Sequence, residues 1–316
     1  MSWKDKLTPK QRSVIEFCER FPEGENMLMK VAKTVSTKFS YSLGCKLLSE
    51  YLNKDLTAIV NEYQKDVKEN AYEAFDKWEE IFENFVVHLE KKDYKSATVA
   101  LYHAGAKALI NSNVPRSRRL QAKSPEISSR TIPGVTIEEL KEIFNMVDPR
   151  ERAIIAFLKD SGISRADVLR LNVGDLKGFE KGERWIHLDV YRGKEKVEYE
   201  TFIGPNTIEA LRAYFTLRER RGETLKLETP VFANDSKPYR RLTDMNLSTI
   251  FRRITSRAGK KISAHRLRKF FETYMALVVR HPIILKYWMG HKIRRSHDVE
   301  ARYIIPPTPE QLKVYK

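Results

Sequence analysis

The sequence predicts a mainly α-helical protein that contains one small antiparallel β-sheet. Apolar residues recur at helical spacing through most of the 316 residues, and residues 184–204 change to a period of two. The hydrophobic fraction of 41% supports globular folding. The length is sufficient for two domains with separate cores, and no internal repeats occur.

The first 112 residues predict helices only, in two segments. Short helical runs at residues 11–20 and 26–37 form an N-terminal segment, residues 1–46, and fit either a helix-turn-helix or plain helix packing. Residues 47–112 form a helical domain, and its apolar stripes predict the core. These stripes comprise Phe75, Trp78, Ile81, Phe82, Phe85 and Val86, followed by Val99, Tyr102, Ala106, Leu109 and Ile110.

Residues 113–133 predict a basic linker, because Pro, Ser, Arg and Lys are frequent there and apolar residues are few. Its basic side chains fit two interpretations, a strap that lies along DNA phosphates or a solvated tether. The candidate DNA-binding residues of the linker are Arg116, Arg118, Arg119 and Lys123.

Residues 134–316 predict a second domain that begins with helices. Thr136 and Glu139 form a capping box at the start of one helix, and Pro149 suits the first turn of the next. Two alternating stretches, residues 186–190 and 197–203, then predict a β-hairpin. We expect Asn206 to cap the helix that follows the hairpin.

The charge balance indicates the class of partner. Lys and Arg total 58 against 42 Asp and Glu, so the formal net charge is +16 and the sequence pI about 9.6. This favours a polyanion, and double-stranded DNA is the first candidate. A membrane surface is the alternative, but long apolar runs and basic amphipathic segments are absent. Two cysteines and the lack of a signal peptide favour a cytoplasmic, DNA-associated protein.

The most basic segment is residues 251–269, which contain no Asp or Glu. Solvated helices usually alternate in charge sign, so this segment favours contact with phosphates. His265 and Arg268 stand three residues apart on a predicted helix and therefore share a face. The other candidate DNA-binding residues here are Arg252, Arg253, Arg257, Lys260 and Lys261.

The order of these motifs resembles the tyrosine recombinases, the phage-type integrases. HRLRKFF (265–271), then WMGH (288–291) and then a tyrosine are similar to the family pattern of H-x-x-R, G-H and Tyr. The hairpin resembles the family's strands whose turn carries a lysine, and SGISRADVLRLNVGDL (161–176) resembles the first arginine helix. The likeness covers roughly residues 134–305 and is greatest to archaeal members carried by viruses and plasmids. Residues 47–112 resemble the family's core-binding domain less specifically.

The resemblance implies a site-specific DNA recombinase that works through a 3′-phosphotyrosyl intermediate. Tyr303 would be the nucleophile, and His265 would take the proton-transfer position. Arg268 and His291 would hold the scissile phosphate, a role that suits the planar guanidinium group.

The resemblance also implies the residue that protonates the leaving group, the need for cofactors and the assembly on DNA. Lys194, in the hairpin turn, would protonate the leaving 5′-hydroxyl, with Lys196 as the alternative. No metal or other cofactor is needed, and no carboxylate cluster suggests one. The protein would assemble into a tetramer on DNA. The tail, residues 306–316, would either dock on a neighbouring protomer or form a frayed terminus.

The sequence departs from the family pattern at the first arginine. The spacing to Asp167 and Asp175 places that arginine at Ser164, whereas the arginine is one position later, at Arg165. One residue along a helix is a rotation of about 100°, and Ser164 with Asp167 suits a helix N-cap. Either Arg165 still reaches the site, or another basic residue substitutes, or the protein is a catalytically impaired DNA-binding protein with a regulatory or maintenance role.

The span from His291 to Tyr303 is also longer than in the family. Tyr315 is therefore a rival nucleophile, although it follows a Pro-Pro break at the chain end. A replication initiator with phosphotyrosine chemistry is a third interpretation, which lacks support because the sequence has no metal-binding histidine pair.

Overall fold

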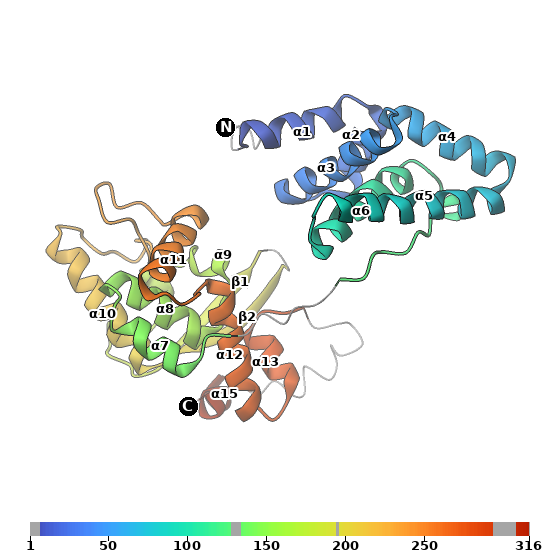
Figure 1. Cartoon of the computed structure of the whole chain (residues 1–316). Helices are drawn as coiled ribbons and strands as arrows, with labels where there is room; N and C mark the ends of the chain where they lie inside the picture. Colours follow the sequence, from blue (N-terminus) through green and yellow to red (C-terminus); the bar gives the residue numbers. More distant parts are fainter. Residues whose placement is uncertain (1–6, 128–133, 194–195, 293–307, 316) are drawn as a thin grey trace. The chain divides into compact units, whose positions relative to one another are not determined.

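The chain is mainly helical with one two-stranded antiparallel sheet, as predicted. The computed structural model describes residues 7–127, 134–193, 196–292 and 308–315. The chain divides into two compact units, residues 1–130 and 131–316 (Figure 1). None of the helices in the described ranges is long and apolar enough to cross a bilayer.

Unit 1 is helical and packs around aromatic side chains. Its described elements are α1 (Pro9–Glu19), α2 (Pro22–Val31), α3 (Val35–Leu52), α4 (Leu56–Glu69), α5 (Ala71–Lys91), α6 (Ser96–Ser112) and the 3₁₀ turn η2 (Arg116–Arg118). The predicted stripes are confirmed, because Trp78, Phe82 and Phe85 of α5 and Val99 and Ile110 of α6 are buried in one cluster.

Helices α3 and α6 approach each other closely because each carries a glycine at the crossing. A Cβ at Gly44 would stand 2.2 Å from the carbonyl oxygen of Tyr102, and a Cβ at Gly105 would stand 2.6 Å from the Cα of Tyr41. The Cys45 thiol donates to the Gly105 carbonyl oxygen at 3.5 Å. Any larger side chain at either glycine would push the two helices apart.

The structure differs from the sequence prediction at three places in unit 1. The helical run expected at residues 26–37 is interrupted, because α2 ends at Val31 and Thr34 caps a new helix with its hydroxyl accepting from the Thr37 amide. The new helix, α3, crosses the expected boundary at residue 46. The start of the expected linker lies on unit 1, where the Leu120 amide donates to Asn111 at 2.8 Å and the Tyr63 hydroxyl donates to the Arg118 carbonyl at 2.7 Å.

Unit 2 contains the sheet and the motifs of the candidate site. Its described elements are α7 (Ile137–Phe144), α8 (Pro149–Ser161), α9 (Arg165–Val168), η3 (Val173–Asp175), β1 (Ile186–Arg192), β2 (Val197–Ile203), α10 (Pro205–Arg220), α11 (Asp244–Ala258), α12 (Ala264–Val278), α13 (Pro282–Trp288) and α15 (Thr308–Tyr315). Helix α8 is central, since residues 153–158 are all buried and the helix contacts α10, α12 and β2.

Local signals set the helix starts and the hairpin register in unit 2. The predicted capping box of Thr136 and Glu139 is present, and Pro149 begins α8. In the hairpin, β1 pairs with β2 from Ile186 opposite Ile203 to Arg192 opposite Val197. The expected Asn206 cap is wrong, because Pro205, whose fixed φ suits the first helical position, already begins α10.

The C-terminal helix α15 packs on its own unit, beside α12 and α13 (Figure 1). The Tyr315 ring lies 5.2 Å from the Phe202 ring and 5.7 Å from the Trp288 ring. The Gln311 side chain is buried and accepts from Trp288 Nε1 at 2.6 Å. Residues 308–315 therefore form a helix that packs on this unit, and the expectation of a frayed terminus is wrong for this stretch.

Candidate active site

Helix α12 presents His265 and Arg268 from one segment, as the sequence predicted. The Ser263 hydroxyl caps the helix by accepting from the Arg266 amide at 3.3 Å, so His265 lies exposed in the first turn. One turn later, Arg268 donates to the Gly162 carbonyl at 2.5 Å and to the Met289 carbonyl at 2.6 Å. These bonds fix its guanidinium between the end of α8 and the turn after α13.

The same turn brings His291 to Arg268. Nε2 of His291 lies 3.2 Å from Nη2 of Arg268, and the imidazole is exposed. Gly290 makes this turn possible because its φ is +61°, and a Cβ there would stand 2.6 Å from the Tyr199 ring. The structure therefore brings Arg268 and His291 together.

Burial and a second guanidinium act on Arg268. The pKa of Arg268 is lowered from its ordinary value, first by burial and then by the nearby positive charge of Arg192. The Tyr199 hydroxyl lies beneath this site and has no hydrogen-bond partner among the described residues. Burial raises the pKa of Tyr199, and the charge of Asp167 raises it further. Two partly buried guanidinium groups, those of Arg192 and Arg268, thus lie close together at this site.

The first-arginine segment begins with the helix N-cap that the sequence predicted at Ser164. The Ser164 hydroxyl accepts from the Asp167 amide and begins α9. Arg165 pairs with Asp244 at 2.5 Å and donates to the Ser248 hydroxyl at 3.1 Å, both in the first turns of α11. The described side-chain contacts of Arg165 are therefore with α11, whereas Arg268 is held by the carbonyls of Gly162 and Met289.

Arg192 is a site residue that the sequence analysis did not identify. It ends β1, opposite Val197, and donates from Nη1 to the carbonyl oxygens of Met289 at 3.1 Å and Gly290 at 2.8 Å. It follows the predicted alternating stretch 186–190, so its side chain received no role. The one available signal was strand alternation, which places Arg192 on the same face as the apolar Val190.

Two predicted catalytic residues, Lys194 and Tyr303, lie outside the described residues. Lys196, the alternative to Lys194, is exposed in the turn immediately before β2, with a φ of +54°. The rival nucleophile, Tyr315, donates from its hydroxyl to the carbonyls of Asp160 and Phe202, at 2.5 and 3.2 Å. Burial raises the pKa of Tyr315 well above its ordinary value, so this hydroxyl is a poor nucleophile in the described position.

Comparison with known proteins identifies the family. The profile of the Phage integrase family matches residues 134–300, which is more than half of the chain. The chain belongs to the phage integrase family. The tyrosine recombinase XerA of Thermococcus kodakarensis is 23% identical over 195 residues, and the tyrosine recombinase XerC of Caldanaerobacter subterraneus is 26% identical over 162 residues.

The match to XerA covers 60% of this chain and 65% of the XerA protein. The match to XerC covers 49% of this chain and 42% of the XerC protein. The fold is also that of solved recombinases. XerH site-specific recombinase, bound to a palindromic difH substrate in a post-cleavage complex, is 17% identical with a TM-score of 0.56 and covers 93% of this chain. A lambda integrase dimer bound to a COC′ core site is 15% identical with a TM-score of 0.55, also over 93%. The two matches span 94% and 95% of those structures.

The candidate DNA-binding residues of the integrase are at its surface, but some already have carboxylate partners. Arg257 pairs with Glu151 of α8, and Lys260 pairs with Glu142 of α7. The absence of acidic residues along the segment 251–269 therefore does not mean that its charges are unbalanced in space. Side chains of the remaining candidates are exposed, namely Arg116, Arg118, Arg119, Lys123, Arg252, Arg253 and Lys261.

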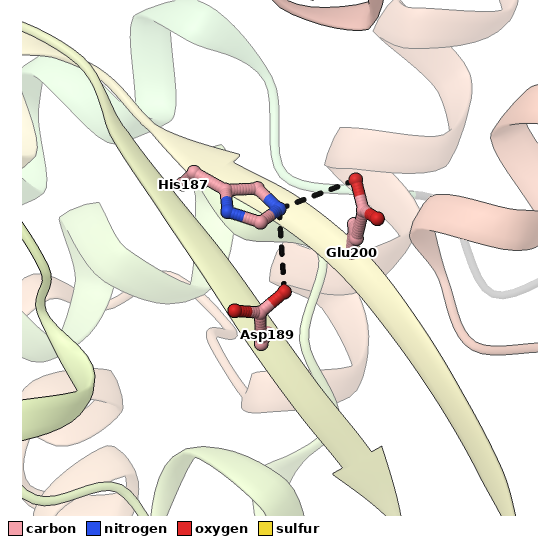
Figure 2. Close-up of side chains that lie close together, drawn as sticks. All are labelled: His187, Asp189 and Glu200. Atoms are coloured by element: carbon pink, nitrogen blue, oxygen red, sulfur yellow. Dashed lines mark ion pairs between the residues drawn. The ribbon is translucent and has the colours of Figure 1, made fainter. Parts of the chain in front are cut away.

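The hairpin also carries a polar cluster that the sequence analysis did not anticipate. His187 Nε2 lies 3.2 Å from Glu200 and 3.5 Å from Asp189, its neighbours on the same face of the sheet (Figure 2). Asp189 also accepts from Lys177 at 2.9 Å, and Glu200 accepts from Thr308 at 2.9 Å. Because Thr308 begins α15, this cluster ties the tail to the hairpin.

Proposed function

We propose that this integrase is a site-specific DNA recombinase that cuts and rejoins duplex DNA through a tyrosyl-phosphate link. The observation that carries the proposal is the contact of partly buried Arg268 with exposed His291 at 3.2 Å in a member of this family. A phosphodiester under attack needs donors that hold its non-bridging oxygens, and guanidinium and imidazole groups are suited to this.

In the proposed reaction, the Tyr303 oxygen attacks phosphorus while His265 accepts the phenolic proton. A bond forms between phosphorus and the tyrosyl oxygen, and the bond from phosphorus to the 5′-oxygen breaks. Lys194 gives a proton to the leaving 5′-oxygen, which becomes a hydroxyl. Attack by a 5′-hydroxyl from another strand reverses these steps, so no nucleotide hydrolysis is required.

Arg268 and His291 would act on the phosphate throughout this sequence. Charge that develops on the non-bridging oxygens meets donors that are already positioned by Gly162 and Met289, so little reorganisation is needed as the reaction proceeds. Exposed His265 lies in the first turn of the same helix, where a DNA-borne group can approach it.

A second candidate function is DNA binding without cleavage, in a regulatory or maintenance role. The observation in its favour is Ser164 at the first-arginine position, together with the engagement of Arg165 by Asp244. Both functions require salt-sensitive duplex binding, so binding alone does not separate them.

The test is covalent capture. Duplexes that the protein binds most tightly are first selected from a random-sequence pool and from candidate attachment sites, then rebuilt with a nick beside each position so that cleavage releases a short fragment and cannot be reversed. A denaturing gel reports protein–DNA adducts. We expect an adduct with the wild type and none with Tyr303→Phe, whose duplex affinity is retained.

An adduct that persists in Tyr303→Phe would refute the proposed nucleophile. Tight binding with no adduct at any nick position would favour the DNA-binding protein. We also propose that the protein acts as a tetramer on DNA, because exchange between two duplexes cuts four strands. Mass photometry of the protein with a long two-site duplex tests this, and dimers alone on every complex would contradict it.

A further inference from the structure

Three side chains of the hairpin that can bind a metal ion converge on one face of the sheet. His187 and Asp189 stand two residues apart on β1, and Glu200 is the direct partner of Asp189 on β2. One donor atom from each residue lies within 4.8 Å of the other two (Figure 2). The cluster depends on strand pairing, so the spacing along the chain did not indicate it.

The donor atoms have the spacing of ligands around a tetrahedral ion. Zinc lies about 2.0–2.2 Å from histidine nitrogens and carboxylate oxygens, so two of its tetrahedral ligands lie about 3.3–3.5 Å apart. In the hairpin, Nε2 of His187 lies 3.5 Å from Oδ1 of Asp189 and 3.2 Å from Oε2 of Glu200. These atoms can therefore bind one ion with little movement of their side chains.

Hydrogen bonding does not account for the position of His187. Its Nε2 atom is buried and makes no hydrogen bond within the part of the chain that the structure describes, although two carboxylates lie within 3.5 Å. A protonated imidazole offers a single N–H at this atom, which cannot point at both oxygens. An ion between the three groups would instead bind the nitrogen lone pair and both carboxylates.

The charges of the cluster also favour a cation. Asp189 and Glu200 are directly opposite each other, and like charges in that arrangement destabilise paired strands. Lys177 pairs with Oδ2 of Asp189 at 2.9 Å, which leaves Oδ1 facing His187. The Lys177 side chain is 72% exposed, so solvent screens this pair. The two carboxylates therefore carry more negative charge than Lys177 offsets.

Helix α15 supports one of the three ligands. Thr308 and Gln311 donate to Oε2 of Glu200 at 2.9 and 3.3 Å, and Tyr287 also hydrogen-bonds to this carboxylate. A carboxylate has about four lone-pair sites, so Glu200 can accept these bonds and still bind an ion. A groove of about 380 Å³, lined in part by His187 and Thr308, gives access to the cluster. Carboxylate ligands of metals are commonly oriented by such outer hydrogen bonds.

We infer that His187, Asp189 and Glu200 bind a divalent transition-metal ion that holds α15 against the hairpin. An imidazole nitrogen with two carboxylate oxygens suits zinc, whereas Mg²⁺ and Ca²⁺ prefer oxygen ligands alone. Three protein ligands leave the fourth position of a tetrahedral ion to water from the groove. None of the three residues takes part in the proposed reaction, so the site stands apart from the recombinase function.

The zinc affinity of the full chain tests the site. The protein is stripped with a chelator and dialysed, and Zn²⁺ is then titrated in competition with a chromophoric chelator at neutral pH. We expect one saturable site per chain. His187→Gln, Asp189→Asn and Glu200→Gln should each lower the affinity at least about tenfold, since even the outer partner of a metal ligand usually contributes about 10- to 100-fold.

Matched variants separate this site from adventitious binding. His88→Gln removes an imidazole of unit 1, and Glu310→Gln removes an exposed carboxylate of α15, so both should keep the wild-type affinity. Thr308→Val removes a hydrogen bond to Glu200 but no ligand, and should weaken binding about tenfold. The absence of a saturable site in the wild type, or an affinity that His187→Gln leaves unchanged, refutes the inference.

Two measurements on the loaded wild type do not depend on the folding of a variant. X-ray absorption should show nitrogen and oxygen at about 2.0–2.1 Å from zinc, and sulfur at about 2.3 Å would place the ion at a cysteine and overturn the site. Hydrogen exchange of residues 308–315 should slow about tenfold when free Zn²⁺ is ten times its dissociation constant. Exchange that Zn²⁺ leaves unchanged would contradict the role of the ion in holding α15.

Discussion

Substitution of Tyr315 by Phe tests which tyrosine is the nucleophile and what the tail contributes to stability. The change removes one hydroxyl and keeps the ring that packs on Phe202 and Trp288. The hydroxyl donates to the carbonyls of Asp160 and Phe202, and a typical hydrogen bond contributes about 1 kcal/mol net. We therefore expect unit 2 to lose about 1–2 kcal/mol of unfolding free energy while the rate of adduct formation stays within about twofold of wild type.

Two measurements on the same preparation decide the outcome. Urea unfolding is followed by tryptophan fluorescence, to which Trp185 and Trp288 contribute beside the Tyr315 ring. Tyr191→Phe is the matched control, because Tyr191 is 53% exposed, and it should change stability by less than about 0.5 kcal/mol. Loss of the adduct in Tyr315→Phe at unchanged stability would refute the reasoning, and would require α15 to leave its described position before cleavage.

Three further predictions concern unit 1. Gly44→Ala should lower the free energy of unfolding of unit 1 by about 2 kcal/mol or more in urea, because the new Cβ would meet the Tyr102 carbonyl. In an ordinary helix, alanine in place of glycine is instead stabilising by about 1 kcal/mol, so a stabilised variant would contradict the close crossing of α3 and α6. Burial lowers the pKa of His103 to about 4, so as the pH falls the unfolded chain takes up a proton near pH 6.5, before the folded chain does. The free energy of unfolding should therefore fall by about 2 kcal/mol between pH 6.5 and pH 5. His103→Gln should remove this loss. Arg116→Ala and Arg119→Ala should each lower the slope of log affinity for duplex against log salt by about 0.9 if their exposed side chains contact phosphates, whereas unchanged slopes would favour a solvated tether.

Features that depend on neighbouring residues were predictable from the sequence. The stripe with Trp78 and Phe82 is buried as expected, because helical periodicity alone fixes which face of an amphipathic helix avoids water. The capping box at Thr136 and the cap at Ser164 are set within four residues. The hairpin follows from alternation and its turn.

Features that depend on distant residues were not predictable in the same way. Glu151 balances Arg257 although more than a hundred residues separate them, so counting charges along the segment 251–269 overestimated its free positive charge. The hydrogen bonds of Arg192 likewise need a turn 97 residues away, at Met289. Periodicity fixes the face on which a side chain stands, and tertiary packing decides what it meets there.

The shared acceptor at Met289 joins the hairpin to α12 at the candidate site. Arg192 and Arg268 donate to the same carbonyl oxygen from different elements, so a shift of the hairpin by an ångström would break one bond and move the other guanidinium. The Tyr199 ring beneath Gly290 leaves no room for the turn to adjust inward, since even a Cβ at Gly290 would stand 2.6 Å from it. The end of β1 and the guanidinium of Arg268 are therefore linked through one carbonyl oxygen, that of Met289.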